Sequence, residues 1–324
     1  METYLGIDVG SVTTKLAVLD ENDELVTDLY LLTKGKPIEM VQQGLKQVKQ
    51  QLSEDIDICG VATTGSARYL SGVIVGADLV KNEITSHAVA TLQYLPEAQT
   101  IIEIGGQDSK IIIIRDGVVI DFGMNTVCAA GTGSFLDHQA LRLNMSIEEF
   151  SRRALASDTT VRIAGRCTVF AESDMIHKQQ MGHRTEDILY GLCQALVRNY
   201  LNNVGLGKDI KSPVVFQGGV AFNQAIVKAL QEELNTEIIV PLHHEIMGAI
   251  GAALLVHEEM LNNDNGSKFK GFSVSEVKYH TSSFQCKSCP NLCEIAQLSL
   301  DSQVLARWGG RCDLWERSPS SEKL

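Results

Sequence analysis

The sequence has no excess of basic residues and no long apolar run. Its 324 residues include 28 Lys and Arg against 40 Asp and Glu, which gives a formal net charge of −12 at pH 7. Nucleic acids and anionic membranes bind proteins through basic faces, so neither is expected as the main partner. No apolar run reaches about 18 residues, so no transmembrane helix is predicted.

The start of the chain also lacks the pattern of a signal peptide. The opening METYLGIDVG has no basic segment followed by an apolar stretch. We therefore expect a cytoplasmic protein. Its eight cysteines are then expected to be reduced, and available as ligands or catalysts rather than paired in disulfides.

Strand and helix signals alternate along the chain. The composition, 44% hydrophobic and 21% charged, is typical of a globular protein, and the length suits two domains. Strands are predicted in residues 4–10, 14–22, 25–33, 57–65, 100–106, 109–117, 118–125 and 236–241. Helices are predicted in residues 37–52 and 246–261. Residues 212–234 are predicted to form a strand, a double-glycine turn and a helix, and residues 262–271 a linker.

Two segments share one design. GIDVGSVTTKLAVLD and EIGGQDSKIIIIRDG each carry an acid at a strand end (Asp8 or Glu103), glycines in the turn, a hydroxyl residue and a lysine before the next strand. Such turns offer backbone N–H groups to phosphate oxygens, and the acid is placed to hold Mg²⁺ through water. A single hairpin of this kind is also explained as an acidic turn without a ligand. Two of them, followed by a Gly-Gly turn before a helix, predict a duplicated two-lobed nucleotide clamp.

Two cysteines stand at predicted helix entrances. Cys128 lies in NTVCAAGTGSFLD and Cys167 in AGRCTVFAESD. Two thiolates are too few for a structural zinc or an iron–sulfur cube, which take four ligands. The alternative is that both are buried small residues. Cys59 and Cys193 lie in apolar strand and helix contexts without a motif, and there the core interpretation is preferred.

The motifs occur in the order found in the actin, hexokinase and Hsp70 superfamily of ATPases. DVGSVTTK resembles its first phosphate loop, EIGGQDSK its second and VVFQGGVAFN its adenosine motif, while GVATTGSARY and GAIGAALL resemble its connecting segments. The resemblance implies an α/β fold with duplicated ribonuclease-H-like lobes, plus a small C-terminal extension. The first lobe is predicted in residues 1–95 with the final helix near 246–259, the second in 96–245, and the linker and extension in 260–324.

The cysteine motifs narrow this resemblance. VCAAGTGSFLD, GRCTVFAESDMI and EIGGQDSK together resemble the activator ATPases of 2-hydroxyacyl-CoA dehydratases and the ATPase subunits of benzoyl-CoA reductases. The resemblance implies a homodimer in which Cys128 and Cys167 of both chains hold one [4Fe-4S] cluster. Doubling two ligands across a two-fold axis gives the four that a cluster needs. ATP hydrolysis would drive electrons from ferredoxin or flavodoxin to a partner iron–sulfur enzyme, a hydroxyacyl-CoA dehydratase, an aryl-CoA reductase or a related protein.

The same resemblance assigns the ATP and Mg²⁺ sites. Catalysis is assigned to Asp8, Gln107 and Asp108, and water-mediated Mg²⁺ binding to Asp8 and Glu103. Nucleotide binding is assigned to Gly10, Ser11, Val12, Thr13, Lys15, Gly105, Gly106, Gly131, Gly133, Gly218, Gly219 and Val220.

Several of these roles have a simpler alternative. Gln107 and Asp108 either orient the attacking water or only cap the turn, and Lys15 either neutralises phosphate or is merely solvated. Glu83 and His87 share one helix face with no role that chemistry assigns, and His243 and His244 are predicted as turn or surface residues. Three departures from the family stand out: Glu103 replaces Asp, TTGSAR replaces Thr-Gly-Tyr-Gly-Arg, and the shorter activators lack the tail.

The tail contains four cysteines of its own. Cys286, Cys289, Cys293 and Cys312 are separated by two, three and eighteen residues. Four soft ligands in one chain complete either a zinc site or a second [4Fe-4S] cluster. The sequence leaves the two metals open, so we predict a Cys₄ metal module.

Two functions from other classes compete with the activator. A small-molecule kinase of the same superfamily would need a general base near an acceptor hydroxyl, and a non-redox actin-like or chaperone-like switch would need no iron. Neither has a use for interfacial cysteines.

Overall fold

The computed structural model describes residues 1–53, 55–165, 167–262, 266–301, 303–312 and 314–315. The chain divides into two compact units: Met1–Glu83 with Gly248–Leu324 (unit 1), and Ile84–Met247 (unit 2). No helix in the described part of the chain combines the length and apolar content that crossing a membrane requires.

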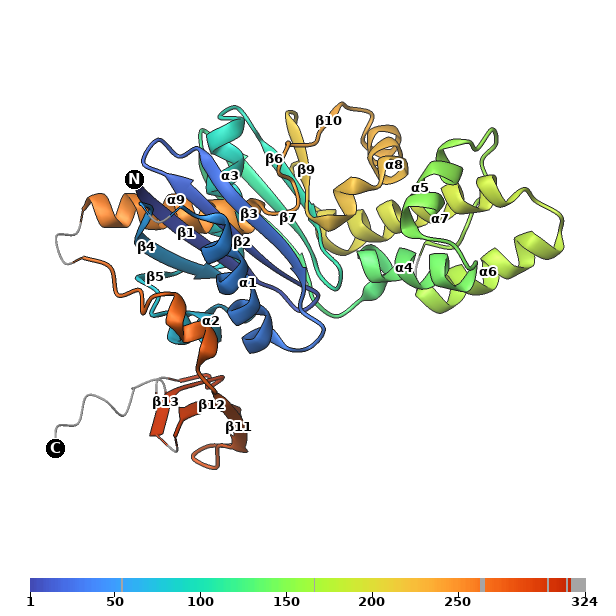
Figure 1. Ribbon diagram of the computed structural model, residues 1–324. Coiled ribbons are helices and arrows are strands. Elements are labelled where there is room, and N and C mark those ends of the chain that lie inside the picture. The colour runs from blue at the N-terminus through green and yellow to red at the C-terminus, as the bar shows by residue number, and fades with distance from the viewer. Residues whose placement is uncertain (54, 166, 263–265, 302, 313, 316–324) are drawn as a thin grey trace. The chain divides into compact units, whose positions relative to one another are not determined.

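Unit 1 is built on a five-stranded sheet with the strand order β3-β2-β1-β4-β5 (Figure 1). Its strands are β1 (Glu2–Val9), β2 (Thr13–Asp20), β3 (Leu25–Leu32), β4 (Asp57–Thr64) and β5 (Leu79–Val80). β2 pairs antiparallel with β1, and β3 pairs antiparallel with β2. On the other side, β4 pairs parallel with β1, and β5 pairs parallel with β4.

Helices cover both faces of this sheet. Leu5 and Ile7 pack in one core with helices α1 (Pro37–Gln51) and α2 (Arg68–Val75), while Tyr4 packs on the other face with α9 (Met247–Leu261). A Cβ on Gly6 would lie 1.9 Å from the carbonyl oxygen of Ala249. Only glycine at this position therefore lets α9 lie so close to the central strand.

Unit 2 repeats the topology of unit 1. Its sheet has the order β8-β7-β6-β9-β10. β7 pairs antiparallel with β6 and β8 pairs antiparallel with β7, whereas β9 pairs parallel with β6 and β10 pairs parallel with β9. The strands are β6 (Thr100–Ile104), β7 (Ser109–Arg115), β8 (Val118–Asn125), β9 (Val214–Gln217) and β10 (Ile238–Ile239). The predicted duplication and two-lobed α/β fold are thereby confirmed.

The duplication extends to the register of the hairpins. Asp8 pairs with Lys15 in unit 1, and Glu103 pairs with Lys110 in unit 2, each 95 positions later. A β-bulge follows at Val18/Leu19 in one unit and at Ile113/Ile114, again 95 positions later, in the other. The two hairpins are therefore equivalent residue by residue, bulge included.

Helices of unit 2 pack on both faces of its sheet. α3 (Glu83–Tyr94) packs against Ile101 and Ile112, whereas the opposite face supports the larger core. That core contains residues from five helices: α4 (Gly133–Arg142), α5 (Ile147–Leu155), α6 (Thr168–Gln180), α7 (Thr185–Tyr200) and α8 (Gln224–Leu234). Three short helical turns are also present in this unit: η1 (Ala129–Gly131), the π-helix η2 (Leu201–Gly205) and η3 (Gly219–Phe222). Asn223 caps α8 by accepting from the N–H groups of Ala225 and Ile226.

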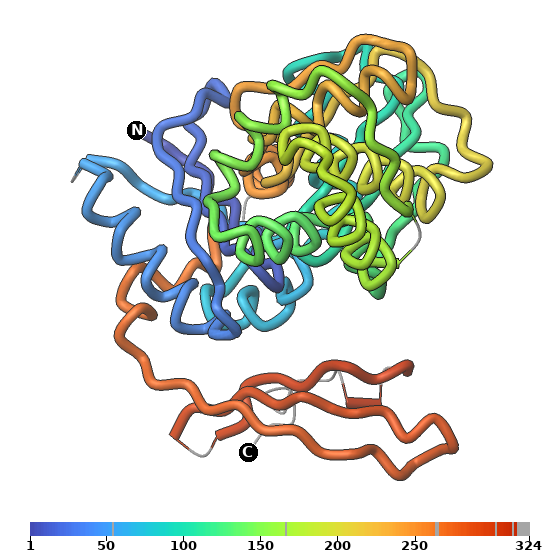
Figure 2. The backbone as a smooth tube through the Cα atoms, turned by 90° about the vertical axis from the view of Figure 1, so that its right-hand side faces the viewer, coloured from blue at the N-terminus to red at the C-terminus, as the bar shows by residue number. Residues whose placement is uncertain are grey.

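The C-terminal extension is a three-stranded antiparallel sheet. After η4 (Phe272–Glu276) come β11 (His280–Gln285), β12 (Glu294–Leu300) and β13 (Gln303–Trp308), which lie side by side in Figure 2. Val274 and Leu298 belong to the same buried cluster as residues of α1 and α2, and Gln42 Nε2 of α1 donates to the carbonyls of Val274 and Val277. The extension is thus packed on unit 1.

Residues 263–265 of the predicted linker lie outside the described residues. The segment that begins at Ser267 is hydrogen-bonded to the loop between α2 and β5. Ser267 Oγ and the N–H of Lys268 both donate to the Asp78 carboxylate, each at 2.6 Å. The predicted strand over 236–241 is real but shorter, limited to Ile238–Ile239.

Candidate functional site

The first phosphate hairpin joins β1 to β2. Asp8 is 5% exposed, and its Oδ2 lies 3.0 Å from Lys15 Nζ. The turn closes through a hydrogen bond from Gly10 N–H to the Thr13 carbonyl, which leaves Ser11 exposed at its tip and Val12 partly exposed. A buried carboxylate and a lysine therefore stand below a turn whose tip is open to a ligand.

The second hairpin repeats this arrangement and adds an acid. Lys110 Nζ lies 2.9 Å from Glu103 Oε2 and 2.7 Å from Asp108 Oδ2, and Gly105 N–H donates to the Asp108 carbonyl as Gly10 does to Thr13. Gln107 is exposed on the turn and Gly106 is partly exposed beside it. One lysine here serves two carboxylates, so Asp108 is held by charge as well as by the turn.

A glycine supports each carboxylate from the neighbouring parallel strand. Gly65 (φ +89°) follows β4 and Gly218 (φ +93°) follows β9. A Cβ on Gly65 would lie 2.5 Å from Asp8 Oδ1, and one on Gly218 would lie 2.7 Å from Glu103 Oε1 and 2.5 Å from the Ile104 carbonyl. Gly218 was predicted from its double-glycine motif. Gly65 was missed as its equivalent, because TTGSAR and FQGGVA share only the glycine.

Alanine at either glycine is expected to destabilise its unit strongly. Gly218→Ala adds a left-handed backbone penalty and an overlap with a backbone carbonyl, which together should lower the free energy of unfolding by about 3 kcal/mol. The matched control is Gly117→Ala: Gly117 has φ +74°, but its Cβ would meet nothing within 4 Å. It should cost only about 1 kcal/mol. Denaturant unfolding of both variants measures the difference, and equal losses would show that the approach to Glu103 carries no constraint.

A buried polar cluster fixes the end of β9. The Gln217 side chain lies 3.0 Å from His87 Nδ1, and Thr91 Oγ1 lies 3.3 Å from Gln217 Oε1 while donating to the His87 carbonyl. Gln217 is fully buried and pairs with Glu103 in the sheet register. His87, which had no predicted role, thus positions the strand that carries Gly218.

The predicted adenosine motif forms η3 directly after β9. Gly219 begins this turn and Val220 is buried within it. His244 packs edge-on against Phe222, and its Nδ1 lies 3.2 Å from the Gly218 carbonyl. His244 was predicted as a turn or surface residue: it does lie in a turn, but it is buried, because segments distant in sequence enclose it.

The Cys128 loop is held by Asn125 at the end of β8. Asn125 Oδ1 accepts from the N–H groups of Val127 and Cys128, and Asn125 Nδ2 donates 2.7 Å to the Cys128 carbonyl. These bonds constrain the loop backbone and leave the Cys128 side chain half-buried. Asn125 was missed from the sequence, where it reads only as the end of a strand.

The helix that follows this loop is hydrogen-bonded to the second phosphate hairpin. The first N–H groups of α4, on Gly133 and Ser134, donate to the carbonyls of Gly105 and Gly106 at 2.9 and 2.8 Å. Gly131 is buried, and a Cβ there would lie 3.1 Å from Cα of Tyr200. The same residue, Tyr200, donates through its hydroxyl to the Lys110 carbonyl. Burial raises the pKa of Tyr200 well above its usual value, so this hydroxyl stays a donor.

Cys167 is exposed at the start of α6. Asp174 Oδ2 accepts from the N–H of Ala164 at 2.8 Å, which ties the preceding loop to the helix. Glu172 pairs with Arg142 at the end of α4. The two helices that begin next to the cysteines are therefore joined by an ion pair.

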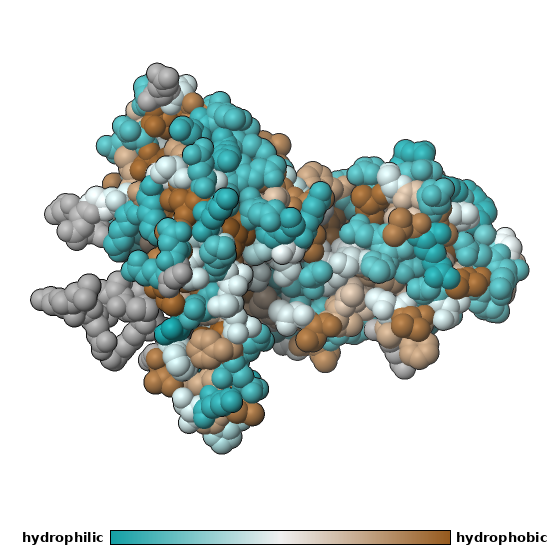
Figure 3. Space-filling view, turned by 60° about the horizontal axis from the view of Figure 1, so that its bottom comes forward, coloured by the Kyte–Doolittle hydropathy of each residue, from teal (hydrophilic) through white to brown (hydrophobic). Residues whose placement is uncertain are grey.

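Large apolar side chains are exposed beside both cysteines. Val127 is 95% exposed next to Cys128, and Val169 and Phe170 are 65% and 64% exposed just after Cys167. On the face drawn in Figure 3, apolar side chains form separate brown areas among hydrophilic ones. Exposed apolar residues next to two ligand candidates favour a protein–protein contact at that place.

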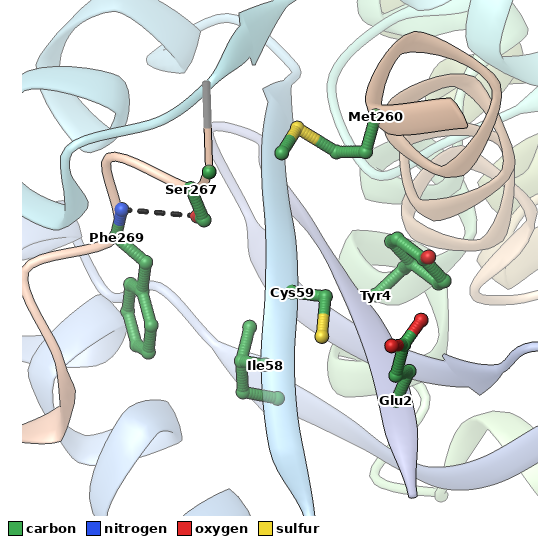
Figure 4. A pocket seen from close by; sticks show the side chains of 8 residues that line it. Glu2, Tyr4, Ile58, Cys59, Met260, Ser267 and Phe269 are labelled. Atoms are coloured by element: carbon green, nitrogen blue, oxygen red, sulfur yellow. Dashed lines mark hydrogen bonds between the residues drawn. The ribbon is translucent and has the colours of Figure 1, made fainter. Parts of the chain in front are cut away.

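Of the two cysteines predicted in the core, Cys193 is fully buried, as expected. Cys59 is only partly buried, and it lines a surface hollow of about 480 Å³ with Tyr4, Met260 and Phe269 (Figure 4). This hollow lies at the start of β1, at the opposite end of the strand from Asp8. Burial raises the pKa of both thiols, to which neighbouring acids add for Cys59, so neither is a reactive thiolate.

The arrangement offers ligands for a phosphate–metal complex rather than a preformed metal cage. Within the described ranges, no three His, Cys, Asp or Glu side chains are placed to hold a metal ion together. Mg²⁺ keeps most of its waters and is commonly held by one or two carboxylates plus substrate phosphates. Asp8 in unit 1 and Glu103 in unit 2 are each a buried carboxylate of the kind that this mode of binding uses.

Comparison with known proteins gives matches over most of the chain. Residues 5–256 match the BadF/BadG/BcrA/BcrD ATPase family. The chain is 34% identical over 261 residues to the 2-hydroxyisocaproyl-CoA dehydratase activator of Clostridioides difficile, which covers 79% of this chain and 95% of that protein.

Two solved structures are also similar. Component A of (R)-2-hydroxyglutaryl-CoA dehydratase from Acidaminococcus fermentans gives a TM-score of 0.73 at 32% identity, covering 81% of this chain and 100% of that one. The activator of the 2-hydroxyisocaproyl-CoA dehydratase from Clostridium difficile with bound ADPNP gives 0.71 at 32% identity, covering 85% and 98%.

Proposed function

Because the chain belongs to the BadF/BadG/BcrA/BcrD ATPase family, we propose that it is an ATP-hydrolysing activator that delivers low-potential electrons to a partner iron–sulfur enzyme. The relatives named as dehydratase activators support a partner of the 2-hydroxyacyl-CoA dehydratase class. Ferredoxin or flavodoxin is the proposed donor.

One observation carries the proposal: the second phosphate hairpin and the Cys128 loop are one connected structure. The N–H groups that begin α4 are bonded to Gly105 and Gly106, and α4 starts five residues after Cys128. A nucleotide that shifts the hairpin therefore shifts the thiol. A small-molecule kinase would have no need of this connection.

The hairpins supply the groups for ATP hydrolysis. Ser11 and Gln107 stand exposed on the two turns, above the Asp8–Lys15 and Glu103–Lys110 pairs. We propose that the turns bind phosphate, that Asp8 and Glu103 hold hydrated Mg²⁺, and that Gln107 orients the attacking water with Asp108 beside it. Gly218, Gly219 and Val220 are the proposed adenosine contacts.

Cys128 and Cys167 would hold a [4Fe-4S] cluster together with the same two residues of a second chain. Their thiols are accessible, each follows a loop and precedes a helix, and exposed apolar side chains flank both. When bound, such a cluster supplies a one-electron carrier. Two ligands per chain are completed to four by a two-fold axis, which is why we propose a homodimer.

The energetic scale is adequate. Shifting a two-state equilibrium from 1:99 to 99:1 takes about 5.5 kcal/mol. For one electron this corresponds to roughly 240 mV, at about 59 mV per tenfold change. Nucleotide-dependent movement of the cysteine loops is therefore able to change an effective potential by a functionally useful amount.

Purification without oxygen tests the proposal directly. We expect a brown dimer with about two irons per chain, equal to one cluster per dimer, and Mg²⁺-dependent ATP hydrolysis. Adding a reductant and ATP should transfer electrons to a 2-hydroxyacyl-CoA dehydratase, and a non-hydrolysable ATP analogue should not sustain turnover. A colourless protein that phosphorylates a small molecule would instead identify a kinase, and a colourless protein that only hydrolyses ATP would identify a non-redox switch.

A further inference from the structure

The sheet register of the extension brings two of its cysteines face to face. Gln285 of β11 pairs with Glu294 of β12, so the next residues outward are Cys286 and Cys293. The N–H of Cys286 donates to the Cys293 carbonyl at 2.8 Å, which continues the ladder by one pair. Residues directly opposite in an antiparallel ladder project their side chains to the same face.

The other two cysteines reach the same end of the sheet. Cys289 lies in the turn that joins β11 to β12. Trp308, the last residue of β13, pairs with Ala296, and a Cβ on the following Gly309 would lie 2.6 Å from the Glu294 carbonyl. The chain after β13 therefore runs back past the start of β12 and carries Cys312 toward Cys293. Four thiols that are up to 26 residues apart in sequence thus lie toward one edge of the sheet, while among the described residues no three of them are close enough to hold an ion together without moving.

The sulfur of Cys286 accepts several hydrogen bonds. The backbone N–H and the hydroxyl of Ser288 donate to it, and so does the indole N–H of Trp315 at 3.2 Å. Trp315 is itself held by Phe284, with ring centroids 4.9 Å apart, and by Arg307 over its ring. Donors aimed at sulfur are the outer-shell contacts that orient a thiolate ligand.

We propose that Cys286, Cys289, Cys293 and Cys312 bind one Zn²⁺ as a closed structural site. The short distance between the directly opposite residues Cys286 and Cys293 favours zinc over a second iron–sulfur cluster. Cβ atoms of directly opposite residues are about 4.5–5.5 Å apart, which suits two thiolates on one ion: Zn–S bonds of about 2.3 Å in a tetrahedron place the sulfurs roughly 3.8 Å apart. A four-iron cluster binds each thiolate on a different iron and spreads them further.

The site would close the open end of a sheet with a small core. Ile295 and Leu298 are fully buried in β12, and Leu298 is shared with the α1 and α2 cluster of unit 1. Cys289 and Cys312 are exposed at the edge where the cysteines lie, and would turn inward on binding the ion. A metal is the usual means by which a module of this size is held together.

Metal analysis of the full chain tests the site separately from the shared cluster. In a Cys128→Ser/Cys167→Ser variant grown with iron and zinc and purified without oxygen, we expect about one zinc per chain and no iron. Adding Cys289→Ser or Cys312→Ser should lower the bound zinc at least tenfold. Adding Cys59→Ser, a thiol outside the extension, should leave it unchanged.

A cobalt titration guards against simple misfolding. Chelated protein refilled with Co²⁺ should show the visible absorption of tetrahedral cobalt thiolate, and zinc should displace it. Four irons per chain in the double variant, zinc retained without Cys289 and Cys312, no metal at all, or a Cys286–Cys293 disulfide in protein kept anaerobic would each overturn the proposal.

Discussion

Cys128→Ser is expected to abolish the shared cluster and with it all ATP-dependent electron transfer. In a homodimer one substitution removes two of four thiolate ligands, and serine is a poor ligand for iron. Iron should fall from about two per chain to none, with loss of the brown colour and of the reduced-state electron paramagnetic resonance signal. Cys167→Ser should have the same effect.

Nucleotide binding should survive in both variants. The Cys128 loop is fixed by Asn125 through backbone groups, and the α4 start is bonded to the hairpin through Gly133 and Ser134. Neither set of contacts uses the thiol. Cys59→Ser is the matched control, with iron content expected at the unsubstituted level. Unchanged iron in both the Cys128 and Cys167 variants would remove the basis for an interfacial cluster.

Asp8→Asn is expected to reduce Mg²⁺-dependent ATP hydrolysis by about a hundredfold, or roughly 2.7 kcal/mol in activation free energy. The amide keeps the size of the side chain and an acceptor for Lys15 Nζ, now 3.0 Å from Asp8 Oδ2. It removes the charge that holds the hydrated metal. The loss should therefore appear in the hydrolysis rate at saturating ATP and in the Mg²⁺ dependence, measured by steady-state kinetics.

A second Asp–Lys pair provides the control for this substitution. Asp121 Oδ1 lies 2.7 Å from Lys208 Nζ on the surface of unit 2, with the Asp121 side chain 49% exposed. Asp121→Asn also removes one carboxylate charge from an ion pair, but an exposed pair contributes little. Its hydrolysis rate should remain within twofold of the unsubstituted protein. Wild-type hydrolysis in Asp8→Asn would exclude Asp8 from the metal site.

The hairpins were predictable because their signals are local. Alternating apolar residues, a glycine turn and an acid–lysine pair all lie within about fifteen residues, and the second copy confirmed the first. The support that Gly65 gives to Asp8 was not predictable in the same way. It depends on the parallel pairing of β1 with β4, which joins residues more than fifty positions apart.

The missed and corrected residues share this cause. Asn125 ends a strand in the sequence, and only the folded loop turns its amide onto Cys128. His244 follows a strand and precedes a helix, which suggests exposure, but Phe222 and Gly218 enclose it. In the extension the cysteine spacing predicted a metal and left zinc and iron equal. The register of β11 and β12 supplied the distance argument that separates them.

The close approach of α9 to Gly6 has a consequence for synthesis. Unit 1 needs residues from both ends of the chain, whereas unit 2 is one continuous segment, Ile84–Met247. A growing chain therefore has all of unit 2 available for folding before Ala249, Ala252 and Val256 emerge to cover the Tyr4 face of the first sheet. Domains generally fold as units during translation, and uncovered apolar strands attract chaperones until then. The unit whose synthesis begins first is thus the unit that is completed last.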